Sequence, residues 1–139
     1  MRILRRANQN GVHLPALTIL YVEDNPELRE ILGEMLQGIE NEVVSFADAE
    51  SALAAWHERP FDVVVTDISL PGISGTELAR RILTSKPQQW VILCSGYQYD
   101  EEFAKLGPNV RSLPKAFDFD EMDALMNEIS RSLDGPLQT

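Results

Sequence analysis

Five polar side chains lie at the ends of short segments that the sequence pattern predicts as β-strands. They are Glu23, Asp24, Asp67, Ser95 and Lys115. Three carboxylates that meet repel one another, and their pKa values rise unless a cation lies among them. Carboxylate oxygens are hard ligands that suit Mg²⁺, which takes one or two carboxylates and keeps several waters. These residue types therefore indicate a magnesium site with room for a further oxygen ligand.

Phosphoryl transfer is the chemistry that such a set could carry out. Asp67 can attack phosphorus and become an aspartyl phosphate. Lys115 offers a point charge for a phosphoryl group, and Ser95 can donate a hydrogen bond to a phosphoryl oxygen. In-line transfer depends on positioning and charge neutralisation more than on acid–base groups. Asp67 by itself could equally be a turn residue or a helix cap, so the interpretation depends on whether the fold brings the five side chains together.

Predicted strands and helices alternate along the chain. The strands are expected at residues 17–22, 42–46, 61–66, 90–94 and 110–113. The helices are expected after N-caps at Asn25, Asp48, Ser74 and Asp118, with a shorter acidic helix from about Tyr99 to Leu106. The first strand is almost continuously apolar, as strands buried on both faces are, and the long helices repeat apolar residues at spacings of three and four. Ser74 and Glu77 have the pattern of a capping box.

This alternation predicts an α/β fold with a parallel sheet, right-handed crossovers and helices on both faces. In such a sheet the carboxyl ends of all strands lie along one edge, where ligands bind. The five polar side chains come from the ends of the first, third, fourth and fifth strands, so we expect them to meet at that edge.

Composition limits the possible functions. A chain of 139 residues with 44% hydrophobic residues corresponds to one domain with a core. The net charge of −10 argues against nucleic-acid and anionic-membrane partners, and no apolar run reaches the length of a membrane span. The single cysteine, Cys94, cannot form an internal disulfide, which indicates a reducing compartment such as the cytoplasm.

The chain divides into three parts. We expect a loose N-terminal extension over residues 1–16, a folded domain over residues 17–134 and a C-terminal tail over residues 135–139. Gly135-Pro136 marks the end of the last predicted helix.

With these motifs, the chain resembles the receiver domain of two-component response regulators. The resemblance covers about residues 17–134. The matching motifs are Glu23-Asp24 after Leu20-Tyr21-Val22, Asp67 in Thr66-Asp67-Ile68-Ser69-Leu70-Pro71-Gly72-Ile73-Ser74-Gly75, Ser95 in Leu93-Cys94-Ser95-Gly96-Tyr97, and Lys115 in Leu113-Pro114-Lys115. The resemblance implies a flavodoxin-like, doubly wound sheet of five parallel strands in the order 2-1-3-4-5, with helices on both faces.

The resemblance also implies a role as the phosphoacceptor of a two-component system or phosphorelay. Asp67 would take its phosphoryl group from a phosphohistidine on a sensor histidine kinase or a histidine phosphotransfer protein. Ser95 and Lys115 would bind the phosphoryl oxygens and signal their presence, and the domain would switch conformation for a downstream protein that the sequence does not identify. Such a domain is not a turnover enzyme, and its self-catalysed phosphorylation and dephosphorylation are at most slow.

The metal ligands follow from the same resemblance. Asp24, Asp67 and the backbone carbonyl of Ser69 would coordinate Mg²⁺, and Glu23 would act mostly through water.

Two positions depart from the family pattern. The family usually has a proline after the lysine, joined by a cis peptide bond, whereas Ala116 follows Lys115 here; a cis bond before a residue other than proline costs about 2.5–4 kcal/mol. The family commonly has Tyr or Phe at the position of Ser112, where the ring responds to the phosphoryl group. Tyr97 and Tyr99 are near enough in the sequence to substitute, although ordinary loop or surface positions are the simpler interpretation.

Two other functions remain open at this point. A degenerate receiver that acts only as a protein-interaction module is compatible with Ala116 and Ser112, although the intact acidic residues count against it. An aspartyl-phosphate hydrolase of the haloacid dehalogenase type needs a second Asp two residues after Asp67, and that position is Ser69. The phosphoacceptor would be a stand-alone receiver or one excised from a longer protein.

Overall fold

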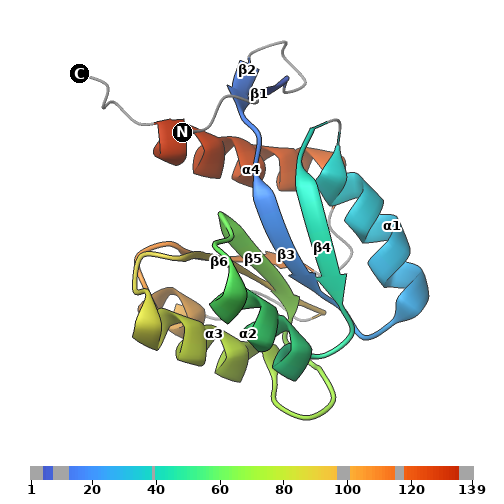
Figure 1. The fold of residues 1–139 in the computed structure, drawn as a ribbon, viewed down its shortest axis with the longest axis vertical. Coiled ribbons are helices and arrows are strands. Elements are labelled where there is room, and N and C mark those ends of the chain that lie inside the picture. Colours follow the sequence, from blue (N-terminus) through green and yellow to red (C-terminus); the bar gives the residue numbers. More distant parts are fainter. Residues whose placement is uncertain (1–4, 8–12, 39, 97–100, 115–117, 135–139) are drawn as a thin grey trace.

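The computed structural model describes residues 5–7, 13–38, 40–96, 101–114 and 118–134 (Figure 1). The elements in chain order are β1 (Arg5–Ala7), β2 (His13–Pro15), β3 (Thr18–Val22), α1 (Pro26–Gln37), β4 (Glu42–Phe46), α2 (Ala49–Glu58), β5 (Val63–Asp67), α3 (Gly75–Ser85), β6 (Trp90–Ser95), the 3₁₀-helix η1 (Glu101–Lys105), β7 (Val110–Pro114) and α4 (Phe119–Asp134). No helix within these ranges is both long and apolar enough to cross a membrane.

The central sheet has five parallel strands in the spatial order β4-β3-β5-β6-β7. Counted along the chain as the five predicted strands, this is the order 2-1-3-4-5, so the predicted fold class is confirmed. The strand order reverses between β3 and β5, which is where a doubly wound sheet opens a crevice at the carboxyl ends of its strands.

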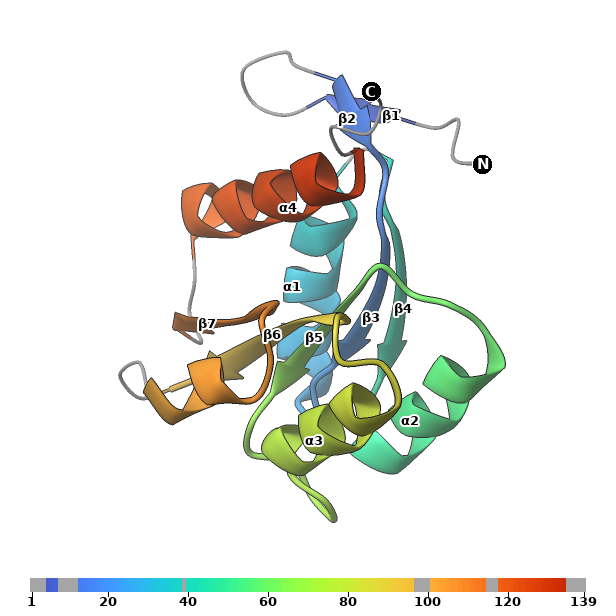
Figure 2. The same cartoon turned by 90° about the vertical axis from the view of Figure 1, so that its left-hand side faces the viewer.

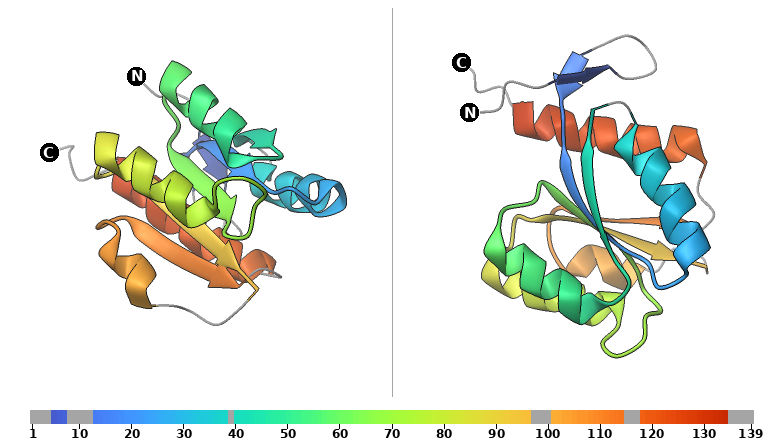
Figure 3. Two further views of the ribbon diagram at one scale, coloured as in Figure 1. Left: turned by 90° about the horizontal axis from the view of Figure 1, so that it is seen from below. Right: turned by 45° about the vertical axis from the view of Figure 1, so that its right-hand side comes forward.

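Helices cover both faces of the sheet. Helices α1 and α4 lie on one face, and α2 and α3 lie on the other (Figure 2; Figure 3). Neighbouring residues along a strand point to opposite faces, so Tyr21 and Val65 pack in the cluster under α1 and α4, whereas Leu20 and Val64 pack in the cluster under α2 and α3. All five residues of β5 are buried, which makes this strand the centre of the fold.

The predicted helix starts are confirmed, with one difference. The Asn25 side chain accepts hydrogen bonds from the backbone N–H groups of Glu27 and Leu28 at the start of α1. At the start of α3, the Ser74 hydroxyl accepts from the Glu77 N–H at 3.1 Å, but the Glu77 carboxylate binds Arg81 instead of completing the predicted capping box.

A reciprocal capping box forms at the start of α4. The Glu121 N–H donates to the Asp118 carboxylate at 2.8 Å, and the Asp118 N–H donates to the Glu121 carboxylate at 3.1 Å. These bonds satisfy two backbone donors that the first turn of a helix otherwise leaves unpaired.

One local expectation was wrong. The acidic helix expected from about Tyr99 to Leu106 is a 3₁₀-helix over Glu101–Lys105, and the Leu106 N–H donates to the Phe103 carbonyl; Tyr99 lies outside the described residues. Five residues followed by Gly107 and Pro108 are too few to propagate an α-helix.

The N-terminal extension is not loose throughout. Strands β1 and β2 pair as an antiparallel hairpin with Arg6 opposite Leu14, and β2 lies against α4. The sequence between the two strands, Asn8-Gln9-Asn10-Gly11, has the composition of a turn.

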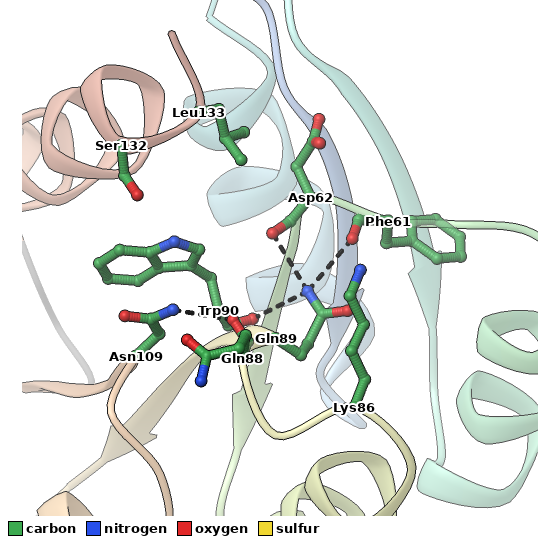
Figure 4. A pocket seen from close by; sticks show the side chains of 9 residues that line it. All are labelled: Phe61, Asp62, Lys86, Gln88, Gln89, Trp90, Asn109, Ser132 and Leu133. Atoms are coloured by element: carbon green, nitrogen blue, oxygen red, sulfur yellow. Dashed lines mark hydrogen bonds between the residues drawn. The ribbon is translucent and has the colours of Figure 1, made fainter. Parts of the chain in front are cut away.

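The amino edge of the sheet is held by a buried amide. Gln89 donates from Nε2 to the backbone carbonyls of Phe61, Asp62 and Trp90 (Figure 4). Its Oε1 accepts a hydrogen bond from the Trp56 indole. A hollow of about 330 Å³ beside this amide lies at the start of β5 and β6. It is therefore at the opposite edge of the sheet from the strand-end carboxylates.

We expect Gly33→Ala to raise the free energy of unfolding by about 0.5–1 kcal/mol, because glycine is a poor residue in the middle of a helix. A Cβ on Gly33 would lie 3.7 Å from Ser45 Oγ and 3.9 Å from Tyr21 Cδ2, which are ordinary contact distances. Gly75→Ala is the control with the opposite sign, since its Cβ would overlap the backbone carbonyl of Asp67. Urea denaturation measures both; a loss of stability in Gly33→Ala would contradict the packing of α1.

Candidate functional site

Three carboxylates meet at the carboxyl edge of the sheet. Glu23 and Asp24 directly follow β3, and Asp67 is the last residue of β5. Val22 pairs with Thr66 in the parallel register, so Glu23, which follows Val22, and Asp67, which follows Thr66, lie side by side. One carboxylate oxygen from each of Glu23, Asp24 and Asp67 lies within 4.8 Å of the others.

This arrangement fits a small divalent cation. Glu23 is 2% exposed and Asp67 is 3% exposed, whereas Asp24 is exposed to solvent. Buried carboxylates in close contact are disfavoured in their charged forms unless a cation or hydrogen bonds compensate. Oxygen ligands on opposite sides of Mg²⁺ are about 4 Å apart, since each lies 2.0–2.1 Å from the ion. The spacing of the three carboxylates is therefore compatible with one Mg²⁺ ion among them.

The two acids after β3 are held in different ways. One oxygen of Glu23 accepts a hydrogen bond from the Asn25 N–H at 3.0 Å. Within the ranges that the structure describes, no residue pairs with the Asp24 carboxylate. Asp24 therefore presents its oxygens to solvent or to an ion, whereas Glu23 has one oxygen already engaged.

The backbone at Asp67 is held by close contacts. The next residue, Ile68, donates its N–H to the Cys94 carbonyl in β6 at 3.1 Å, and the Gly75 N–H donates to the Ile68 carbonyl at 2.9 Å. The first residue of α3 must be glycine, because a Cβ on Gly75 would overlap the Asp67 carbonyl. The Thr66 hydroxyl also donates to that carbonyl at 2.9 Å. The end of β5 is thus fixed from β6 and from α3.

The loop between β5 and α3 is tied to α2. Gly72 has a φ of 76°, a conformation that residues with a side chain rarely adopt. The Glu50 carboxylate of α2 lies against Gly72 and accepts a hydrogen bond from the Ile73 N–H at 3.3 Å. The same loop carries Ser69, which is exposed. Glu50 thus steadies the segment that contains the Ser69 carbonyl.

The phosphoryl-binding residues expected from the sequence are only partly described. Ser95 is the half-buried last residue of β6, and it pairs in register with Pro114 at the end of β7. Lys115 and Ala116 lie outside the described residues, as do Tyr97 and Tyr99, so the Lys115–Ala116 peptide bond stays untested.

Ser112, the second departure from the family pattern, lies within β7. It is half-buried and pairs in register with Leu93. The Cys94 side chain is buried in the core, as expected from its strand.

A buried tyrosine lies on the same face of the sheet as the acids. Burial raises the pKa of the Tyr21 hydroxyl above its usual value near 10, and Glu23, Cys94 and Asp67 raise it further, while Arg29 lowers it. The sequence pattern alone did not single out Tyr21 as part of the site. Its position two residues before Glu23 was the available signal, because alternate residues of a strand share a face.

The sequence matches the family described as the response regulator receiver domain over residues 19–127. Among curated proteins, it is 46% identical over 67 residues to the virulence sensor protein BvgS of Bordetella bronchiseptica. The aligned residues make up 48% of this chain and 5% of that protein. It is 32% identical over 139 residues to the transcriptional regulatory protein TcrA of Mycobacterium tuberculosis, with 99% of this chain and 54% of that protein covered. The chain thus spans about half of one relative and a small part of the other.

Solved structures agree with the sequence match. The response regulator TrrA of Thermotoga maritima, in complex with Mg²⁺-BeF, aligns with a TM-score of 0.74 and 32% identity over 81% of this chain and 98% of that chain. The receiver domain of the hybrid histidine kinase CckA aligns with a TM-score of 0.69 and 27% identity over 82% of this chain and 99% of that chain.

The raised pKa of Tyr21 predicts a loss of stability at alkaline pH. An unfolded chain releases the phenolic proton near pH 10, before the folded protein does, so unfolding is favoured as the pH rises past about 10. Tyr21→Phe removes this contribution and keeps the ring. We expect the variant to gain stability relative to the wild type between pH 7 and about pH 10.5, measured by urea denaturation in EDTA. A difference in stability between the variant and the wild type that does not change with pH would contradict the raised pKa of Tyr21.

Proposed function

The chain belongs to the response regulator receiver domain family of two-component systems, and on that premise we propose that Asp67 is the phosphoacceptor in a Mg²⁺-dependent phosphorelay reaction. The observation that carries the proposal is the meeting of the Glu23, Asp24 and Asp67 carboxylates within 4.8 Å at the carboxyl edge of the sheet. A cluster of this kind provides a nucleophile and a cation site in one place.

The proposed transfer is a displacement at phosphorus. A carboxylate oxygen of Asp67 attacks the phosphorus atom of a phosphohistidine as the P–N bond breaks. The electron pair of that bond leaves with the imidazole nitrogen, which then takes up a proton, and the product is an acyl phosphate. The hydrogen bonds that fix the backbone around Asp67 hold the nucleophile at the end of β5.

The metal ligands are proposed from the family resemblance, and the meeting of the three carboxylates supports them. Asp24, Asp67 and the backbone carbonyl of Ser69 would bind Mg²⁺, and Glu23 would act mostly through water. The hydrogen bond from the Asn25 N–H to one Glu23 oxygen is compatible with this indirect role. Bound Mg²⁺ would neutralise charge that develops on the phosphoryl oxygens. The Mg²⁺-BeF complex of the related TrrA supports this choice of cation.

Membership of the family suggests roles for two more residues and for the phosphodonor. Ser95 and Lys115 would bind the phosphoryl oxygens. The phosphodonor would be a sensor histidine kinase or a histidine phosphotransfer protein, and the relatives include the sensor proteins BvgS and TorS. We propose that the chain acts in the cytoplasm as a switch for an unidentified downstream protein and not as a turnover enzyme.

Labelling with radioactive acetyl phosphate and MgCl₂ tests the phosphoacceptor. We expect acid-stable, base-labile label on the wild type and none on Asp67→Asn, because the amide is a poor nucleophile. Asp48→Asn is the matched control: it makes the same chemical change, and Asn still caps α2, so this variant should be labelled normally.

Two results would contradict the proposal. A wild type that stays unlabelled, even with a phosphorylated histidine phosphotransfer protein as donor, would favour the interaction module. Rapid multiple turnover of a phosphate ester would favour the hydrolase.

Substitutions of the two acids after β3 should differ in how much they raise the Mg²⁺ concentration that labelling requires. We expect Asp24→Asn to raise the Mg²⁺ concentration for half-maximal labelling by about tenfold or more. Glu23→Gln should have a smaller effect, because Gln can still accept from the Asn25 N–H and the side chain acts through water. The measurement is the labelling rate across a MgCl₂ titration. Equal effects of the two substitutions would contradict the proposed division between direct and water-mediated ligands.

A further inference from the structure

Arg29 is an unusual residue for its position. It lies in the first turn of α1, where a positive charge opposes the helix dipole. It is half-buried. Within the described parts of the chain its guanidinium forms no ion pair; it donates its side-chain hydrogen bonds to backbone carbonyls instead. Arg29 in this position lowers the stability of α1, and its contacts indicate a role other than helix formation.

The two carbonyls that Arg29 contacts flank a single residue. Its Nη1 donates to the Glu23 carbonyl at 2.8 Å and to the Asp24 carbonyl at 3.5 Å, the second bond being the weaker. These carbonyls belong to the peptide groups on either side of the Asp24 α-carbon. One guanidinium therefore restrains both backbone dihedral angles of Asp24.

Asp24 depends on such a restraint more than its neighbours do. Its carboxylate is exposed and has no partner among the described residues, so the direction of the side chain is set by the backbone that carries it. Glu23, by comparison, is held through its own carboxylate by the Asn25 N–H. Since Arg29 contacts carbonyls, it fixes the loop and leaves the Asp24 oxygens to a cation.

We propose that Arg29 is a positioning residue for the divalent-cation site, acting through the peptide groups that flank Asp24. The inference rests on the proposed function, because it assumes that the acidic cluster binds Mg²⁺. The NH₂ group of Arg29 Nη1 has two N–H bonds that donate to the two carbonyls, whereas the lysine side chain is one bond shorter and ends in a compact point charge. Arg29→Lys therefore keeps the charge and removes the clamp, and Arg29→Gln removes both.

Mg²⁺ binding to the full chain, measured by isothermal titration calorimetry, tests the proposal. We expect Arg29→Lys and Arg29→Gln each to weaken Mg²⁺ binding by about tenfold, the usual scale for residues that orient metal ligands. Arg59→Gln is the matched control: it also removes one guanidinium, but Arg59 pairs with Glu42 at the amino edge of the sheet. This variant should bind Mg²⁺ as the wild type does.

The alternative role for Arg29 is purely electrostatic, and it predicts the opposite result. Removal of a nearby positive charge would tighten Mg²⁺ binding in Arg29→Gln and leave Arg29→Lys unchanged; that pattern would overturn the proposal. A wild type that binds no Mg²⁺ would refute the proposed function itself, whereas wild-type affinity in Arg29→Lys would refute only the positioning role.

A second measurement separates positioning from a general effect on the fold. The labelling rate of each Arg29 variant with acetyl phosphate should return close to the wild-type rate at saturating Mg²⁺, with only the half-saturating concentration raised. Thermal unfolding in EDTA shows whether each variant is folded. A folded variant with a lower labelling rate at saturating Mg²⁺ and unchanged Mg²⁺ affinity would contradict the proposal.

Discussion

Two carboxylates that lie almost wholly out of solvent set the main constraint on this structure. Glu23 and Asp67 are 2% and 3% exposed, and Asp24 adds a third carboxylate within 4.8 Å. Burial and mutual repulsion of carboxylates both cost free energy, so the cluster needs positive charge or hydrogen bonds around it. The three carboxylates meet as a direct result of topology, because β3 and β5 are parallel neighbours in which Val22, just before Glu23, pairs with Thr66, just before Asp67.

The surroundings of the cluster act mainly on the backbone. Gly75 allows the start of α3 to pack against the Asp67 carbonyl, Glu50 holds the loop after β5, and Arg29 holds the loop after β3. Restraint through the backbone fixes where an acid is placed without using its carboxylate as the point of attachment. Such support is what a preorganised site needs, because a cation or phosphoryl group then meets ligands that are already in position.

Much of the fold and of the acid cluster could be predicted, because strand segments and strand-end acids are local patterns and parallel strands share one edge. The strand order came only from the resemblance to a family. The two predicted capping positions show why a local pattern is not sufficient. Ser74–Glu77 and Asp118–Glu121 have the same spacing, but only the second pair forms a reciprocal capping box. Arginines three and four residues after Glu77 compete for its carboxylate. The contacts of Arg29 escaped prediction because they depend on how α1 approaches the loop before it.

The contacts of Asp67 also determine which elements respond first to a change at this residue. Its carbonyl packs against Gly75 at the start of α3, and the next residue, Ile68, is hydrogen-bonded to the Cys94 carbonyl in β6. A displacement of the Asp67 backbone therefore acts directly on α3 and β6. Ser112, in the neighbouring strand β7, has no ring that could rotate in response. Strand β7 is paired with β6 along its whole length, and Lys115, which we propose to bind the phosphoryl group, directly follows it. A signal could therefore reach β7 through the backbone of β6 and through this lysine without a rotating ring.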